Sequence, residues 1–343
     1  MKTRPAAALL LAAMLIMCGG AFADDGPGAG PGVAAVLANE PGLLESFEPF
    51  LRIDGDYADA WTWDLDNLRV FAQVMYEFGE AKEKYGLDLT YPVSTEGLDD
   101  LHASASAQFS EKQFRELADT LRAAADGKKV VIVDLREESH YFLNGISISS
   151  FKLHNWGNLG LEQDEIESAE AELFKAMLGK TVTAYMEDDE EKQEEQLAIT
   201  VESVMSEREL VESEGFTYLR LAVTDHAWPT PDEIDRFIEC VKTMGMEDTW
   251  FHFHCYAGQG RTGAYLALYD KMKNPDVDTQ DILYRHAMTG SNYPLYLGSE
   301  GSYKAPLYAE KAEMMPMLMQ YVEENHEGGY AVSWSEWLAE QDA

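Results

Sequence analysis

The sequence predicts an α/β fold with a central, mostly parallel sheet flanked by helices. Three short apolar runs carry this prediction, and they cover residues 130–133, 218–223 and 250–253. Apolar runs of this length are typical of strands that are buried on both faces. Helical patterns lie between or after these runs, at residues 231–244, 263–273 and 309–324. Strands that alternate with helices in this way indicate an α/β sheet.

Ionisable residues follow each of the three predicted strands. In chain order they are Asp134 and Arg136, Asp225 and His226, and His254 and Cys255. Ligands of open α/β sheets bind beyond the carboxyl ends of the strands. We therefore expect these side chains to surround one site.

The N-terminus predicts a secretory signal peptide at residues 1–23. A basic start is followed by an apolar run too short to span a bilayer comfortably, and then by an A-x-A site that predicts cleavage after Ala23. A lipoprotein signal processed at Cys18 is the alternative, which Met17 disfavours because a small residue usually precedes such a cysteine. We expect a secreted or periplasmic protein.

The chain is strongly acidic. It has 62 Asp and Glu against 26 Lys and Arg, and loss of Lys2 and Arg4 with the signal peptide brings the net charge from −36 to −38. This excess argues against nucleic acid and anionic membranes as partners, because both require a basic surface. The two remaining cysteines do not suggest a disulfide framework, and no membrane span is expected in the mature chain. The oligomeric state stays open.

The mature chain is expected to be one domain with a small insertion. Residues 24–42 predict a flexible linker, because they begin with the Gly/Pro-rich stretch DDGPGAGPG, so the folded domain is expected at 43–343. An acidic helix and two strand-like segments at about 153–215 predict an inserted β unit. The charge run EDDEEKQEEQ within this insertion predicts a solvated loop.

The stretch FHFHCYAGQGRTG places a cysteine between a buried strand and a glycine-rich loop that opens a helix. Gly258 and Gly260 permit positive φ and a close approach of the backbone. The N–H groups of such a turn and of the helix N-terminus form an anion-binding hollow, and Arg261 can hold two oxygens of a phosphate. This positive potential favours the thiolate form of Cys255, to which Thr262 can donate its hydroxyl. The loop predicts a phosphate cradle with a nucleophile.

Two other interpretations of the cysteines are weaker. A metal site at His252, His254 and Cys255 is disfavoured, because the histidines share a strand face that the cysteine does not, and no further Cys/His cluster supplies ligands. A redox partnership of Cys240 with Cys255 is the other. Cys240 lies on the side of the helix at 231–244 that predicts a core position.

Asp225 is the expected general acid. An alcohol leaves a phosphate ester poorly unless a proton arrives with it. Asp225 closes the second strand, and Thr230, Pro231 and Glu233 predict a capped helix start just after it. Residues 225–229 then form a short loop that can move.

HCYAGQGRT resembles the signature HCxxGxGRT of the cysteine phytases, which are protein-tyrosine-phosphatase-like inositol polyphosphate phosphatases. TDHAWPTP resembles the acid loop of that family, and DLREESHYFLNG, NWGNLG, LYR, MKNP and the terminal W-S-x-W-L are also similar, so the resemblance runs from about Asn67 to the C-terminus. It implies a tyrosine-phosphatase-like core, a small inserted partial β-barrel, and no metal or other cofactor. The implied activity is hydrolysis of phytate and related inositol phosphates through a phosphocysteine.

The same resemblance implies residue roles. Cys255 would be the nucleophile, Arg261 the phosphate binder and Asp225 the acid, while Thr262 and His254 would tune the thiolate. The implied substrate contacts are Tyr256, Ala257, Gly258, Gln259 and Gly260 in the loop, and Arg69, Arg136, His140, His226, Lys304 and Tyr308 elsewhere.

Two departures from the family pattern bear on the substrate. Asn155 stands where the family commonly has an acidic residue, and the acidic run replaces a stretch that is basic in relatives. The net charge should slow the approach of phytate, although charges beyond about 8 Å are screened at physiological salt. A positive ring is expected from Arg69, Arg136, Arg261, Arg285 and Lys304.

Two alternatives to a phytate-hydrolysing enzyme stay open: another substrate class, and phosphate binding without catalysis. A phosphatase for phosphotyrosine or phosphoinositide lipids would share this chemistry. A phosphate-binding module without catalysis is disfavoured, because both Cys255 and Asp225 are present.

Overall fold

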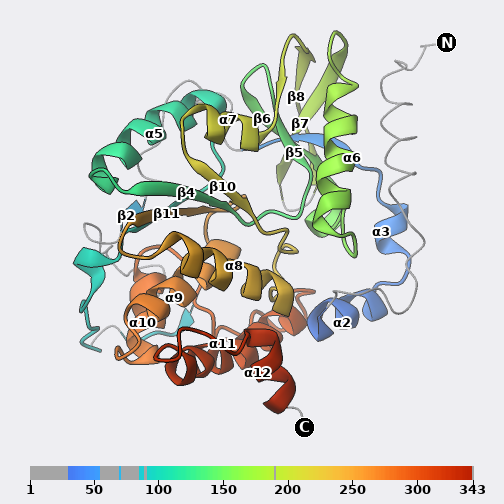
Figure 1. Cartoon of the computed structure of the whole chain (residues 1–343). Coiled ribbons are helices and arrows are strands. Elements are labelled where there is room, and N and C mark those ends of the chain that lie inside the picture. Colours follow the sequence, from blue (N-terminus) through green and yellow to red (C-terminus); the bar gives the residue numbers. More distant parts are fainter. Residues whose placement is uncertain (1–29, 55–68, 71–84, 89–90, 189–190, 342–343) are drawn as a thin grey trace, which may run out of the picture.

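The computed structural model describes residues 30–54, 69–70, 85–88, 91–188 and 191–341 (Figure 1). The predicted signal peptide and its cleavage site lie outside the described residues. Among the described residues, none of the helices combines the length and the apolar character that a bilayer crossing requires.

A five-stranded sheet forms the centre of the molecule, in the order β10-β4-β11-β3-β2. Its strands are β10 (Thr217–Arg220), β4 (Lys129–Asp134), β11 (Thr249–His254), β3 (Ala103–Ser106) and β2 (Arg69–Val70). All neighbours are parallel except β2, which runs antiparallel to β3 at the edge. The predicted α/β fold is confirmed, and the three apolar runs are β4, β10 and β11. In the register, Asp134 is paired with both His254 and Arg220, so these strands end at one edge.

Helices cover both faces of this sheet (Figure 1). One face carries α5 (Glu111–Ala125) and α7 (Glu207–Ser213), which pack on Val130, Ile132 and Trp250. The other face carries α8 (Pro231–Met244) and α9 (Gly260–Lys273), which pack on Val131 and Phe251. Beyond them lie α10 (Thr279–Met288), α11 (Ala305–Asn325) and α12 (Trp334–Gln341). The loop after β11 therefore leads into α9, a helix that is buried between the sheet and the helices α10, α11 and α12.

A second sheet of six strands packs beside the first, in the order β8-β7-β1-β6-β5-β9. Its elements are β1 (Phe50–Ile53), β5 (His140–Leu143), β6 (Ile146–Phe151), β7 (Thr181–Asp188), β8 (Glu191–Thr200) and β9 (Val204–Met205), and α6 (Gln163–Lys175) covers it. The expected β insertion at about 153–215 supplies β7, β8 and β9 of this sheet, and β1, β5 and β6 come from earlier in the chain. Closure into a partial barrel is not confirmed.

The described residues of the acidic run, 187–188 and 191–196, are strand and not loop. They belong to the hairpin of β7 and β8, in which Glu187 pairs with Lys192 and Asp188 pairs with Glu191. The backbone ladder of a hairpin tip does not depend on apolar side chains, which is why the charge pattern was a poor guide there.

The described part of the expected linker at 24–42 is largely helical. Within it, α2 (Pro31–Asn39) packs on α11, and α3 (Leu43–Ser46) follows. Val33 and Val36 are buried against Leu307 and Trp156. Proline in the first turn suits a helix start, so the Gly/Pro-rich stretch leads directly into folded structure.

Candidate active site

A pocket of about 340 Å³ is lined by the segments that follow the carboxyl ends of β10 and β11. It brings together ten of the predicted site residues, which are Asp225, His226, Cys255, Tyr256, Ala257, Gln259, Gly260, Arg261, Lys304 and Tyr308. The expectation that the strand ends meet at one site is thus confirmed for the second and third strands.

The loop from Cys255 to Gln259 joins β11 to the first turn of α9. Gly258 has φ of 65°, and a Cβ atom there would lie 2.4 Å from the carbonyl oxygen of Ser106. The loop is held from outside by Gln108 N–H, which donates to Tyr256 O at 3.0 Å, and by Asn292 N–H, which donates to Gln259 O at 3.1 Å. These contacts fix the loop at the N-terminus of α9, where its amides can face an anion.

The left-handed backbone of this loop yields a test. Gly127 also has positive φ, 85°, but has open space around its Cα, so alanine there is strained only in its backbone. We expect Gly127→Ala to cost about 1–2 kcal/mol of unfolding free energy. Gly258→Ala should cost more and also weaken binding of inorganic phosphate, because the new methyl group meets the β3 backbone. Urea unfolding and calorimetry measure both, and equal costs at the two positions would contradict this account.

The Thr262 hydroxyl departs from expectation. It is buried, and in the described part of the chain it has no hydrogen-bond partner, so the predicted donation to the Cys255 sulfur is not formed.

Arg261 reaches the pocket from α9 and is hydrogen-bonded to Glu138, which does not itself line the pocket. Its Nη1 donates to Glu138 Oε2 at 2.6 Å and to Val223 O at 3.0 Å, and its Nη2 donates to Glu138 Oε1 at 2.9 Å. Nη2 also lies 3.3 Å from Asp225 Oδ1. Burial would lower the pKa of Arg261, but Asp225 and Glu138 hold it well above its usual value. The guanidinium is therefore a fixed positive charge.

Asp225 lies beside Arg261, in the loop between β10 and α8 and five residues after the strand ends. Its Oδ2 accepts from Asn155 Nδ2 at 2.8 Å, its Oδ1 accepts from the His226 N–H at 3.0 Å, and its carbonyl accepts from Trp156 Nε1 at 3.0 Å. Burial would raise the pKa of Asp225, but Arg261 and then His226 outweigh burial and bring it to about 2.

Several further polar side chains in the pocket were missed by the sequence reasoning, and they are Arg52, His154, Asn292 and Lys311. Asn155, noted only as a departure from the family, is there too. Arg52 comes from β1, pairs with Asp54 at 2.9 Å, and places its guanidinium 3.9 Å from the centroid of the Tyr256 ring. Lys311 is one helical turn from Tyr308 on α11, so helical spacing from Tyr308 could have predicted that Lys311 faces the same pocket. Burial lowers the pKa of Lys311 to about 8.

Two predicted cations of the positive ring are not in the pocket. Arg136 is fully buried behind Arg261, where its Nη2 lies 3.0 Å from Asp54 Oδ2 and its Nε 2.9 Å from Glu138 Oε1. Arg285 is buried against Asp270 on α9. Each pairs with a buried carboxylate and neither lines the pocket, so neither is available to a substrate.

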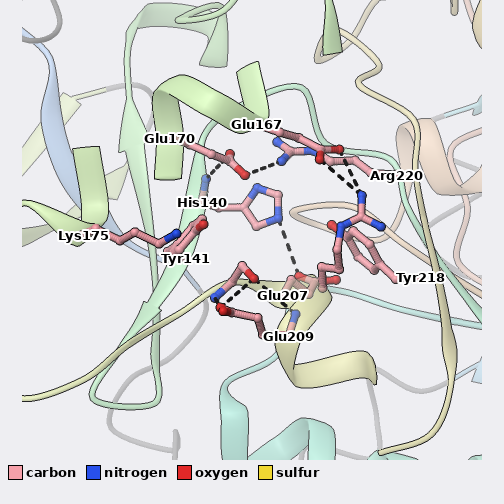
Figure 2. Close-up of a pocket in the computed structure, with 11 residues that line it drawn as sticks. His140, Tyr141, Glu167, Glu170, Lys175, Glu207, Glu209, Tyr218 and Arg220 are labelled. Atoms are coloured by element: carbon pink, nitrogen blue, oxygen red, sulfur yellow. Dashed lines mark hydrogen bonds and ion pairs between the residues drawn. The ribbon is translucent and has the colours of Figure 1, made fainter. Parts of the chain in front are cut away.

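His140 also lies elsewhere, in a separate pocket of about 240 Å³ between α6 and α7 (Figure 2). Figure 2 shows its ring between Glu170 and Glu207, with Tyr218 and Arg220 beside it. Its Nε2 is 3.2 Å from Asp134 Oδ2 and 3.6 Å from Glu207 Oε2. The predicted substrate contact of His140 is therefore wrong.

Asp134, His140 and Glu207 place ligand-type atoms within 4.8 Å of one another, which raises the question of a metal. Burial and Arg136 would lower the pKa of His140, but Asp134 and its hydrogen bond help to raise it to about 9. Arg220 Nε also lies 3.5 Å from Asp134 Oδ2, so this carboxylate already has a cationic partner within the protein. The three groups form a charge network.

The two histidines of β11 also have protein partners. His254 Nε2 lies 2.7 Å from Glu207 Oε1, on the α7 side of the sheet, and His252 bonds to the hydroxyls of Ser104 and Ser106. The role of His254 in tuning the thiolate stays a prediction. Arg69 begins β2 opposite Ala105, and its contact with substrate stays a prediction as well.

The comparisons with known proteins agree with this geometry. The family model for the PTP-like phytases, described by inositol hexakisphosphate, matches residues 133–272. The tandemly repeated protein-tyrosine-phosphatase-like phytase of Mitsuokella multacida is 38% identical with a TM-score of 0.79, over 84% of this chain and 49% of that one. A PTP-like phytase of Bdellovibrio bacteriovorus is 27% identical with a TM-score of 0.65, over 85% of this chain and 95% of that one.

A curated relative is more distant. Effector protein hopD2 of Pseudomonas syringae pv. tomato is 28% identical over 253 residues, which are 72% of this chain and 53% of that protein. The chain thus spans about half the length of hopD2 and of the Mitsuokella protein. Fold and site together define a tyrosine-phosphatase-like domain with a cysteine at the end of its central strand. Residues 133–272 match the PTP-like phytase model, and the chain is similar to the solved PTP-like phytases over more than four fifths of its length, in agreement with the resemblance of its loop sequence.

Proposed function

We propose that the chain is a cysteine-dependent phosphatase that hydrolyses phosphomonoesters of inositol polyphosphates through a phosphocysteine. The observation that carries this proposal is the meeting of Cys255, Arg261 and Asp225 in one pocket, with Arg261 Nη2 and Asp225 Oδ1 3.3 Å apart. A nucleophile, a phosphate binder and an acid are the parts that the reaction needs.

The first step forms a sulfur–phosphorus bond. The Cys255 thiolate attacks phosphorus, and the bond from phosphorus to the alcohol oxygen breaks. Asp225 gives its proton to that oxygen, so the alcohol leaves neutral. The Arg261 fork and the amides of the loop stabilise the three phosphoryl oxygens during the transfer.

The protonation of Asp225 depends on the substrate itself. Its pKa of about 2 follows chiefly from the attraction of Arg261. A phosphate dianion bound to Arg261 offsets that attraction and adds a negative charge nearby, so the pKa of Asp225 rises on binding. The carboxyl group can then carry the proton that the leaving alcohol takes.

The second step releases phosphate. Asp225, now a carboxylate, takes a proton from water while the water oxygen attacks phosphorus and the sulfur–phosphorus bond breaks. Inorganic phosphate leaves, and the thiolate and the protonated acid are restored.

The basic side chains of the pocket support a substrate with several phosphates. A monophosphate would need only Arg261 and the loop. Three further cationic side chains line the pocket, and they are Arg52, Lys304 and Lys311. His154 and His226 line it as well, and burial lowers the pKa of His226 to about 4. The pocket is thus locally basic although the chain has a net charge of −36. The PTP-like myo-inositol phosphatase of M. multacida has been solved with myo-inositol-(1,3,4,5)-tetrakisphosphate, which supports the same class of ligand here.

Phosphate release from inositol hexakisphosphate in excess chelator tests the proposal. We expect turnover that the chelator does not lower, with kcat/KM at least about tenfold above that for a phosphotyrosine peptide. The reverse preference would establish the alternative, a phosphotyrosine or phosphoinositide phosphatase. Binding of inositol hexakisphosphate without release of phosphate would establish a binding module and overturn the proposal.

A further inference from the structure

The turn at Leu153–Asn155 and the residue after it hold the acid loop at two points. The Asn155 amide donates to the Asp225 carboxylate at 2.8 Å, and the Trp156 indole donates to the Asp225 carbonyl at 3.0 Å. Trp156 is fully buried among Val33, Val36 and Leu307. The second contact therefore comes from a side chain anchored in the core.

The Asn155 side chain is suited to this place by its two different ends. Its Oδ1 accepts from Arg52 Nη1 at 3.0 Å, while its Nδ2 donates to Asp225 Oδ2. A guanidinium can only donate and a carboxylate can only accept, so a group between them must accept on one side and donate on the other. An amide does both, whereas an aspartate would set a second carboxylate against Asp225. The backbone of Asn155, with φ of 63°, is one that asparagine tolerates well.

We propose that Asn155 is a positioning residue for the general acid, which holds the Asp225 carboxylate beside Arg261 before substrate binds. The proposal rests on the proposed function in giving Asp225 the role of acid. The proposal explains why an uncharged residue stands at this position. The Asn155 amide can bond to Arg52 of β1 and to Asp225 of the acid loop at the same time.

The charges around Asp225 set the expected effect of replacing Asn155. The groups that face Asp225 are Arg261 on α9, Glu138 after β4, His226 in the same loop, and Tyr308 and Lys311 on α11. The Asn155 amide lowers the pKa of Asp225 through its hydrogen bond. Asn155→Ala removes this effect, and Asn155→Asp replaces it with a like charge, so both variants raise the pKa of Asp225.

Two substrates separate a positioning role from a structural one. With inositol hexakisphosphate, whose alcohol needs a proton, we expect Asn155→Ala to lower kcat about tenfold. With p-nitrophenyl phosphate, whose phenolate leaves without one, the loss should be less than about twofold. Asn155→Asp should move the alkaline limb of the kcat profile up by about one pH unit. In an Asp225→Asn background, Asn155→Ala should cause no further loss.

Asn144 provides the matched control. It also has a left-handed backbone, with φ of 52°, but lies in the turn between β5 and β6, where its side chain bonds to residues 200, 202 and 203. Asn144→Ala and Asn144→Asp carry similar backbone strain and should leave both rates and the pH profile unchanged.

Hydrogen exchange gives a readout that does not require activity. In Asn155→Ala, amides of residues 225–230 should exchange faster than in the unmodified protein, and in Asn144→Ala they should not. Unchanged exchange there, or equal losses on both substrates, would overturn the proposal. If the unmodified protein released no phosphate from either substrate, the proposed function would fall, whereas the exchange result would still decide whether Asn155 holds the loop.

Discussion

Cys255→Ser is expected to lower phosphate release from inositol hexakisphosphate by about 10⁴-fold or more, with little change in affinity. A serine hydroxyl stays un-ionised near neutral pH and is a much weaker nucleophile than a thiolate. Arg261 and the loop amides remain, so the substrate should still bind. Initial rates and calorimetric titration of the same preparation measure both quantities.

Cys240→Ser is the matched control. Cys240 lies half-buried on α8, packed against the core of the helical layer, and burial raises its pKa to about 11. Its replacement should cost some stability and leave kcat unchanged. Hydrolysis that persists in Cys255→Ser, or that disappears in Cys240→Ser, would remove the basis for a phosphocysteine.

Local patterns were sufficient for the parts of the fold and site that neighbours in sequence determine. The strands β4, β10 and β11, the loop from Cys255 to Arg261 and the position of Asp225 all follow from short stretches. Strand β3, ASAS, was missed because alanine and serine lack the bulk of a typical buried strand. It supplies the carbonyl against which Gly258 packs.

Long-range pairing explains the remaining misses. Arg52 reaches the pocket because β1 pairs with β6, about 100 residues away in sequence, and no local pattern shows that. Arg136 was wrongly placed in contact with substrate for the same reason. A cation after a strand looks alike whether it faces a ligand or a buried carboxylate, and the carboxylate here, Asp54, comes from the residue after β1.

Glu138→Gln is expected to reduce both stability and turnover, because Glu138 is the shared partner of two buried arginines. Its Oε1 lies 2.9 Å from Arg136 Nε and 2.9 Å from Arg261 Nη2, and its side chain is 1% exposed. An amide would leave the guanidiniums with less negative charge and with a donor facing them. Removal of one partner from a buried ion pair typically costs about 3–5 kcal/mol. The Arg261 fork would also lose its orientation, so kcat should fall.

The pH dependence of this loss has a definite sign. Burial would raise the pKa of Glu138, but Arg261 and Arg136 hold it well below its ordinary value. The ionised carboxylate therefore stabilises the fold above the pKa that it has in the unfolded chain, and this contribution disappears as the pH falls toward the folded-state pKa. Urea unfolding should show the full difference between Glu138→Gln and the unmodified protein at pH 7, and a smaller difference in acid.

Glu170→Gln is the matched control, because it breaks a buried ion pair that does not involve Arg261. Glu170 pairs with Arg220 at 2.6 Å in the pocket of Figure 2, which Cys255 does not line. Glu170→Gln also breaks a buried pair, so it should lower stability while kcat stays close to that of the unmodified protein. If the two variants lost turnover equally, the role of Glu138 would be structural only, like that of Glu170. If only Glu138→Gln lost turnover, the Glu138 carboxylate would be the group that orients the Arg261 guanidinium toward phosphate.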